Sequence, residues 1–279
     1  MKIGANVHSR FGNVDKEHPI PAGYCLKSRE ALDAMIQELW SLKIHMRTSR
    51  VRTLLWLAER DPVETPWLHV PLLPGEANLI RDLCRNSPVP VEIAAGPLWE
   101  CRWMVDDPDI PAVPVLPDNP YKTVDELFAA MRDSLWPILF NPDGSPALPP
   151  HTRFDIWSEF DLADGQLEIM RLWYPWSRDA CRQAGIQSTV SVIVPEDCTA
   201  TRAMEAYDWL AGLGAGLPDV VSVHINFVPD SAIVDRFWRV TTELSDKFGL
   251  PILIGEDDMT RGPEAMSVIA GTVGEYLVW

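Results

Sequence analysis

The stretch that decides the fold runs from residue 188 to residue 225. It contains a short apolar run, STVSVIV at 188–194, then helical periodicity at 199–212, then a second apolar run, VVSVHI at 220–225. Apolar strands that alternate with amphipathic helices are typical of parallel strands joined by crossover helices. The unit therefore predicts an α/β fold with a parallel sheet.

The same alternation extends over the whole chain in both directions. Strand-like runs lie at 3–7, 51–56, 89–94, 153–157, 188–194, 220–225, 251–254 and 274–278, and helical patterns lie near 28–43, 74–86, 121–136, 164–184, 199–212, 230–247 and 261–270. Eight parallel strands in 279 residues favour a (β/α)8 barrel, or TIM barrel, over an open sheet. We expect residues 1–279 to form one catalytic domain, with a proline-rich loop at 96–120 over the barrel mouth.

The last predicted strand ends close to Trp279, so we expect the barrel to lack its last outer helix. An apolar patch would then lie between the first and seventh helices, covered by neighbours of Tyr276 or by a second subunit. A homodimer is therefore a hypothesis, and a monomeric mass in light scattering at micromolar concentration would contradict it.

Composition excludes several classes of partner. The formal net charge of -16 repels nucleic acid and anionic membrane surfaces. No run of about 20 apolar residues could span a bilayer, and no signal peptide is evident, so we expect a cytoplasmic protein. The five cysteines are scattered without a Cys-x-x-Cys pair, which indicates reduced thiols and no structural zinc.

Two glutamates stand just past strand-like runs about a hundred residues apart. Glu159 ends the segment FDIWSE at 154–159, and Glu256 ends PILIGE at 251–256. Two carboxylates at the carboxyl ends of different parallel strands can face each other across a bond. Splitting a glycosidic bond needs one acid and one nucleophile or base, so the pair indicates sugar chemistry.

In a barrel of this type, the active site is built from strand ends and the loops after them. The strand-end residues are Asn6, His8, Arg52, Trp56, Trp99, Glu159, Asp161, Glu196, His224, Asn226, Glu256 and Trp279. Strict side-chain alternation would put residues 252, 254 and 256 on one face, and residues 155, 157 and 159 on one face of another strand. Both glutamate side chains could then point into the barrel mouth.

These segments resemble the large clan of retaining glycoside hydrolases whose catalytic glutamates lie on the fourth and seventh barrel strands. FDIWSEFD at 154–161 resembles the strand that carries the acid/base, and PILIGE resembles the strand that carries the nucleophile. The segment VHIN at 223–226, Arg52 and the final Trp279 are similar to other site segments of the clan. The helix after Glu159 is most similar to the β-xylosidase and α-iduronidase branch.

The resemblance implies a carbohydrate substrate, no cofactor, and double displacement with Glu159 as acid/base and Glu256 as nucleophile. It implies substrate-binding roles for Arg52, Ser158, His224, Asn226 and Trp279, and the strand-end tryptophans Trp56 and Trp99 are further substrate-binding candidates because their rings can stack on sugar faces. Two positions depart from the clan pattern, because Ser158 stands where an asparagine is usual and Asn226 where a tyrosine is usual. We expect Arg52 and His224 to keep Glu256 ionised, and Trp157 to raise the pKa of Glu159.

The sequence leaves alternatives open for the function and for the roles of single residues. A catalytically inactive barrel could bind carbohydrate, or a metal-dependent hydrolase could use Glu256, Asp257 and His224. His224 could be a core histidine, and Arg52 a structural partner of Asp155 or Glu92.

The tryptophans fall into two predicted groups. We expect an outer-layer packing set, Trp40, Trp173, Trp209 and Trp238, and a sugar-stacking set, Trp56, Trp99, Trp103, Trp157 and Trp279.

Motifs of other enzyme classes are missing from the sequence. It contains no Gly-x-Ser-x-Gly elbow, no P-loop and no Gly-x-Gly-x-x-Gly fingerprint that opens a helix. The glycines at 212, 214 and 216 follow a helix, which predicts a turn.

Overall fold

The computed structural model describes residues 3–8, 33, 36–37, 48–60, 67–68, 75–97, 121–162, 164–194, 200–225, 233–257 and 276–278. For β1, β2, β3, β9 and the last four residues of β8 it describes the backbone. The elements in chain order are β1 (Ile3–His8), β2 (Thr48–Arg60), β3 (Trp67–Leu68), α2 (Glu76–Asn86), β4 (Val91–Pro97), α4 (Val124–Leu139), β5 (Arg153–Asp155), α5 (Asp164–Ala184), β6 (Gln187–Val194), α6 (Thr201–Gly212), β7 (Val220–Ile225), α7 (Ile233–Phe248), β8 (Ile252–Asp257) and β9 (Tyr276–Val278).

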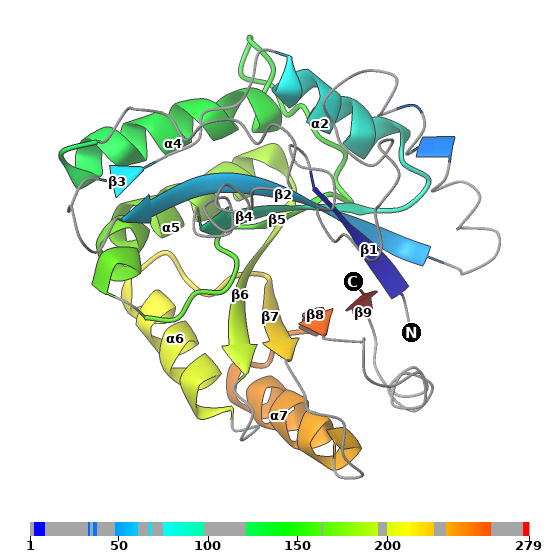
Figure 1. Ribbon diagram of the computed structural model, residues 1–279, viewed down its shortest axis with the longest axis vertical. Helices are drawn as coiled ribbons and strands as arrows, with labels where there is room; N and C mark the ends of the chain where they lie inside the picture. The colour runs from blue at the N-terminus through cyan, green and yellow to red at the C-terminus, as the bar shows by residue number, and fades with distance from the viewer. Residues whose placement is uncertain are drawn as a thin grey trace, which may run out of the picture.

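The sheet closes on itself. Strands follow the order β1-β9-β8-β7-β6-β5-β4-β2, all neighbouring pairs are parallel, and β1 also pairs with β2. The helices lie outside this ring of strands (Figure 1). The predicted (β/α)8 barrel is therefore confirmed, and all eight predicted strands are present.

Several boundaries differ from the predicted ones. β2 runs to Arg60, past the predicted end at residue 56, and the short β3 pairs with its end in antiparallel orientation, which the sequence pattern did not predict. The regular ladder of β5 stops at Asp155, two residues earlier than predicted. The predicted helix at 261–270 and residues 98–120 of the proline-rich loop lie outside the described residues.

Local sequence signals account for the helix ends. Thr123 and Glu126 form a capping box at the start of α4, in which Thr123 Oγ1 accepts from the Glu126 amide at 3.2 Å and the Glu126 carboxylate accepts from the Thr123 amide at 3.3 Å. Gly185 after α5 and Gly249 after α7 have φ of 68° and 64°, a region that favours glycine. Both glycines therefore end their helices.

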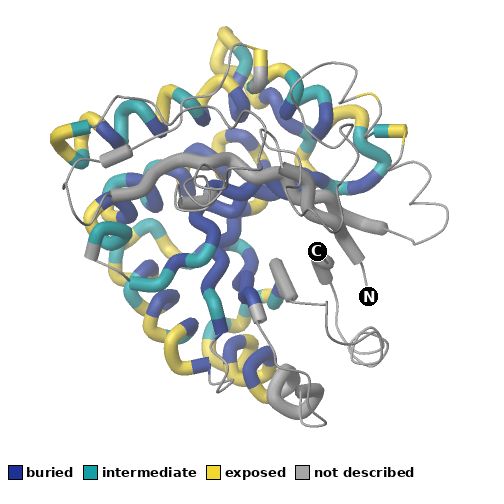
Figure 2. The backbone as a smooth tube through the Cα atoms, viewed as in Figure 1, coloured by how far each residue is buried: buried dark blue, intermediate teal, exposed yellow. Residues whose placement is uncertain are grey.

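Aromatic packing fixes α5 against the sheet. The Trp173 ring is fully buried, stacks on Trp176 at 5.2 Å between centroids, and donates its indole N–H to the Ile156 carbonyl at 2.9 Å. Trp209 on α6 packs against Phe160 at 5.5 Å. The predicted outer-layer role of Trp173 and Trp209 is confirmed, and the described core follows the inner strands (Figure 2). The side chains of Trp40 and Trp238 lie outside the described part.

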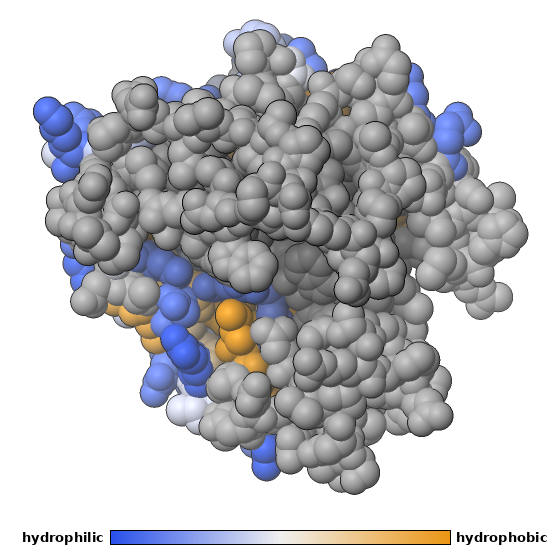
Figure 3. All heavy atoms as spheres, viewed as in Figure 1, coloured by the Kyte–Doolittle hydropathy of each residue, from blue (hydrophilic) through white to orange (hydrophobic). Residues whose placement is uncertain are grey.

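The surface of the described residues is mainly polar. Figure 3 shows hydrophilic side chains on one face with a small group of hydrophobic ones between them. Trp136 is 40% exposed and is the only large hydrophobic side chain of the described set that is open to solvent. No helix in the described ranges is long and apolar enough to cross a membrane.

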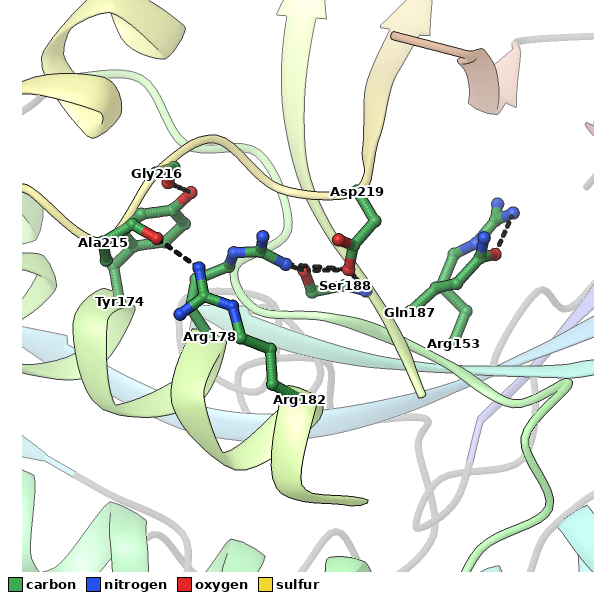
Figure 4. Close-up of polar contacts among 9 residues, drawn as sticks. All are labelled: Arg153, Tyr174, Arg178, Arg182, Gln187, Ser188, Ala215, Gly216 and Asp219. Atoms are coloured by element: carbon green, nitrogen blue, oxygen red, sulfur yellow. Dashed lines mark hydrogen bonds and ion pairs between the residues drawn. The ribbon is translucent and has the colours of Figure 1, made fainter. Parts of the chain in front are cut away.

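A polar cluster ties α5 to the amino-terminal ends of β6 and β7. Arg178 Nη1 donates to Asp219 Oδ2 at 2.7 Å, and the same oxygen accepts from the Ser188 amide at 2.8 Å (Figure 4). Tyr174 and Arg182 donate to the carbonyls of Gly216 and Ala215 in the predicted glycine turn. The cluster lies at the barrel end opposite Glu159, where polar networks serve stability.

The charge of Asp219 makes stability depend on pH. Burial by itself would raise the pKa of Asp219, but hydrogen bonds from Arg178 and Ser188 and the Arg178 charge outweigh it, so the net pKa is lowered. A lowered folded-state pKa stabilises the fold above the unfolded value of about 3.9, and this stabilisation is lost as pH falls through the folded-state pKa.

Asp219→Asn should therefore lower the free energy of unfolding by about 1 kcal/mol at pH 7, since the carboxylate is partly exposed and solvent screens the pair. The difference from wild type should shrink below about pH 4. Urea unfolding at pH 3 to 7 measures this, with Asp133→Asn as a control for the loss of one exposed negative charge. A difference that does not change with pH would contradict the assignment.

Candidate functional site

Glu159 stands in a turn that is fixed to two neighbouring strands. The Ser158 amide donates to the Ala95 carbonyl of β4 at 2.6 Å, and the Phe160 amide donates to the Ser191 carbonyl of β6 at 2.8 Å. Between these two bonds, Glu159 has a φ of 60°. A non-glycine residue in this left-handed region costs roughly 1–2 kcal/mol, so the surrounding hydrogen bonds hold Glu159 in a strained conformation.

His224 on β7 is the partner of the Glu159 carboxylate. Its Nδ1 lies 3.2 Å from Glu159 Oε1, and the imidazole is fully buried while 18% of the Glu159 side chain remains exposed. The histidine thus holds one carboxylate oxygen from inside the barrel. The sequence predicts that His224 acts on Glu256, whose side chain lies outside the described part of the structure, and it does not predict the contact with Glu159.

Glu256 lies beside His224 in the sheet register. Val223 pairs with Ile254, but the next residue, His224, pairs with Glu256, so the register shifts by one residue at Gly255. Strict alternation over 252, 254 and 256 is therefore wrong for β8, because an extra residue in a strand reverses the alternation that follows it. The structure describes the backbone of Glu256, and His224 is both its register partner in the sheet and a side-chain contact of Glu159.

Below Glu159 and His224, polar side chains occupy inward positions of β5, β6 and β7. Asp155, Ser191 and Ser222 are fully buried, and Asp155 accepts from both the amide and the hydroxyl of Ser191. Ser222 Oγ lies 3.3 Å from Ser191 Oγ. Ser191 and Ser222 are not among the predicted site residues, although Thr189 and Ser191 alternate with Val190 and Val192, a pattern that indicates an inward polar face.

A buried ion pair lies nearer the amino-terminal end of the barrel. Arg153 Nη1 is 3.6 Å from Glu92 Oε2, and both side chains are nearly inaccessible. The register pairs Arg52 of β2 with Glu92, so of the two structural partners considered for Arg52, Glu92 is its neighbour in the sheet. Asp155 has Ser191 as its partner.

The other predicted substrate-binding residues are spread over the chain. Ser158 is 6% exposed and follows β5 directly. Arg52 and Trp56 lie on β2, where Trp56 pairs with Gly96 of β4. Trp99, Asn226 and Trp279 lie outside the described residues, as does Trp103.

The burial of Trp157 contradicts its predicted role in stacking on a sugar face. Its side chain is 1% exposed and belongs to the hydrophobic core, so it cannot stack on a sugar face without the core opening. The reason is the turn after Asp155, in which the Trp157 carbonyl accepts from the Ser191 amide at 3.0 Å and the ring is enclosed.

Other nucleophiles and metal ligands find no support among the described residues. Burial raises the pKa of the Cys84 thiol to about 12 and that of the Cys181 thiol further, so both remain unreactive thiols, and both are free as predicted. Within the described ranges, no group of three or more His, Cys, Asp and Glu side chains is arranged to hold a metal ion.

The backbone strain at Glu159 can be tested by a pair of substitutions. The free energy of unfolding of Glu159→Gly should be about 1 kcal/mol higher than that of Glu159→Ala, because only glycine adopts positive φ without cost. At Glu168, an exposed position inside α5, the order should reverse, with glycine about 0.5–1 kcal/mol less stable than alanine. Urea denaturation of the four variants measures both differences. The same order at both positions would contradict the strain.

Comparisons with known proteins give a fold and no family. Neither a scan against protein-family models nor a search of curated proteins finds a match.

Solved structures do match the chain. It is similar to a fungal β-1,4-galactanase, with a TM-score of 0.56 and 11% identity over 100% of this chain and 88% of that chain. It is similar to the β-glycosidase from the hyperthermophile Thermosphaera aggregans, with a TM-score of 0.54 and 11% identity over 100% of this chain and 87% of that chain. A hyperthermophilic β-glucosidase mutant matches with a TM-score of 0.53 and 10% identity over 100% of this chain and 90% of that chain. The chain therefore has the (β/α)8-barrel fold of these glycosidases, and at such identities the likeness extends to the fold alone.

Proposed function

We propose that the protein is a glycoside hydrolase that cleaves O-glycosidic bonds with retention of configuration, with Glu159 as acid/base and Glu256 as nucleophile. Residues 1–279 would form a single catalytic domain, since the barrel strands extend from residue 3 to residue 278.

The observation that carries the proposal is the position of His224 between the two glutamates. It contacts Glu159 at 3.2 Å and pairs with Glu256 in the sheet. Both glutamates follow or end parallel strands at the carboxyl-terminal barrel face, where barrel enzymes carry their active sites. Two carboxylates from different strands at one point of that face suit a reaction with one acid and one nucleophile.

The proposed reaction has two displacements. In the first, a Glu256 oxygen attacks the anomeric carbon while Glu159 gives its proton to the leaving oxygen, so that the glycosidic bond breaks and a glycosyl-enzyme ester forms. In the second, Glu159 takes a proton from water, the water oxygen attacks the anomeric carbon, and Glu256 leaves as carboxylate. The contact with His224 would hold the Glu159 carboxyl in one orientation through both steps.

The substrate-binding part of the proposal rests on six further residues. Arg52 and Trp56 on β2, together with Trp99, Ser158, Asn226 and Trp279, would line the sugar site. A serine hydroxyl at 158 is shorter than the asparagine amide of the clan pattern, so a bond to the sugar 2-hydroxyl would need a closer approach. This predicts weaker discrimination at that hydroxyl.

The sugar itself is proposed only as a class. The β-xylosidase and α-iduronidase branch is the finer hypothesis, and the similar solved structures are a β-glycosidase, a β-glucosidase and a β-1,4-galactanase. A screen should therefore include aryl β-glucoside, β-galactoside, β-xyloside and α-iduronide, with β-1,4-galactan as a polymer.

Glu256→Gln should abolish turnover on any substrate that the wild type cleaves, with kcat/KM lower by on the order of 10⁴-fold or more, while binding persists. Assays with and without chelator separate this reaction from a metal-dependent one, in which chelator would remove activity. Proton NMR of the first product should show the anomer of the substrate. Binding without turnover on every substrate would favour an inactive carbohydrate-binding barrel.

Glu159→Ala should affect substrates according to their leaving group. For a poor leaving group, kcat/KM should fall by about 10²–10⁴-fold because protonation is lost, whereas an activated nitrophenyl leaving group should be affected much less. Azide should then restore turnover by attacking the glycosyl-enzyme. Equal losses for both leaving groups would rule out Glu159 as the acid/base.

A further inference from the structure

Ser191 on β6 makes main-chain and side-chain bonds to residues on both sides of Glu159. Its amide donates to the Asp155 carboxylate at 2.9 Å and to the Trp157 carbonyl at 3.0 Å, and its carbonyl accepts from the Phe160 amide at 2.8 Å. These contacts bracket Glu159, since they hold the residues four and two positions before it and the residue directly after it. One residue of β6 thus holds the turn that carries the glutamate.

The Ser191 hydroxyl extends this connection across three strands. It donates to Asp155 Oδ2 on β5 and lies 3.3 Å from Ser222 Oγ on β7. β5 leads into the Glu159 turn, and β7 carries His224 two residues after Ser222. The hydroxyl therefore connects the strands that supply the two members of the Glu159–His224 contact.

Burial makes this connection stiff. Asp155, Ser191 and Ser222 are all fully buried, so a lost hydrogen bond there is not replaced by solvent. Without the Ser191 hydroxyl, Asp155 loses one of its donors, and the turn that holds Glu159 at φ 60° keeps the main-chain bonds to Ser191 but loses one side-chain restraint. The turn can then relax and move the carboxyl away from His224.

We propose that Ser191, together with Asp155, is the positioning residue of Glu159: it sets the backbone of the turn and thereby the contact of Glu159 with His224. The catalytic consequence rests on the proposed function, whereas the geometric consequence does not. A reacting carboxyl must be held within about 0.5 Å of its productive position, so loss of the hydroxyl should impair proton transfer more than nucleophilic attack.

The test compares Ser191→Ala with Ser177→Ala, which removes a fully buried hydroxyl of α5 outside this network. The first readout is the NMR signals of the His224 ring, which His224→Gln identifies among the six histidines. These signals should shift in Ser191→Ala and stay at their wild-type positions in Ser177→Ala. Asp155→Asn should shift them as well.

The second readout is the dependence on leaving group. In Ser191→Ala, kcat/KM for a poor leaving group should fall by about 10-fold, and that for an activated leaving group by less than about 3-fold, since only proton transfer depends on the position of Glu159. A purely structural role would lower both by the same factor. Should Ser191→Ala not fold, Ser222→Ala, which removes only the 3.3 Å contact, takes its place in both measurements.

The outcomes separate the two proposals. His224 signals at their wild-type positions in Ser191→Ala would overturn the positioning role, whether or not the protein is an enzyme. Equal losses for both leaving groups would also overturn it. Shifted signals in a protein that cleaves no glycoside would support the positioning role and refute the proposed reaction.

Discussion

Closure of the parallel sheet is the constraint on which the rest of the structure depends. β1 pairs with β2 on one side and with β9 on the other, so the main-chain groups of each barrel strand find partners on both sides. Because all eight strands run in the same direction, their carboxyl ends meet at one face. Residues as distant in sequence as Glu159, His224 and Glu256 come to that face for this reason.

The interior of the described half of the barrel is unusual in its polarity. Barrels of this type are commonly filled by branched aliphatic side chains, whereas here Glu92, Arg153, Asp155, Ser191 and Ser222 are buried inside. Buried polar groups are costly unless they find partners, and hydrogen bonds such as those among Asp155, Ser191 and Ser222 restrict the geometry of the strands. The buried polar groups thus lower the stability of the fold and restrict the positions of the strands that carry the candidate site.

The two ends of the described barrel differ in how their polar groups are held. At the amino-terminal end, hydrogen bonds among Arg178, Ser188 and Asp219 fix α5 to β6 and β7. At the carboxyl-terminal end, Glu159 has a positive φ, is partly exposed and contacts His224 of a neighbouring strand. Backbone strain such as that at Glu159 persists when the structure around it is rigid, and the opposite end supplies part of that rigidity.

The sequence by itself determined the eight strands, their parallel order and the position of the two glutamates after strand ends, because apolar periodicity and glycine stops are local properties. Only the tertiary structure decided the partner of His224, the register shift at Gly255, the enclosure of Trp157 and the hydrogen bonds of Ser191. Each depends on how one strand is aligned with the next, and this alignment follows from hydrogen bonds between residues that are far apart in sequence.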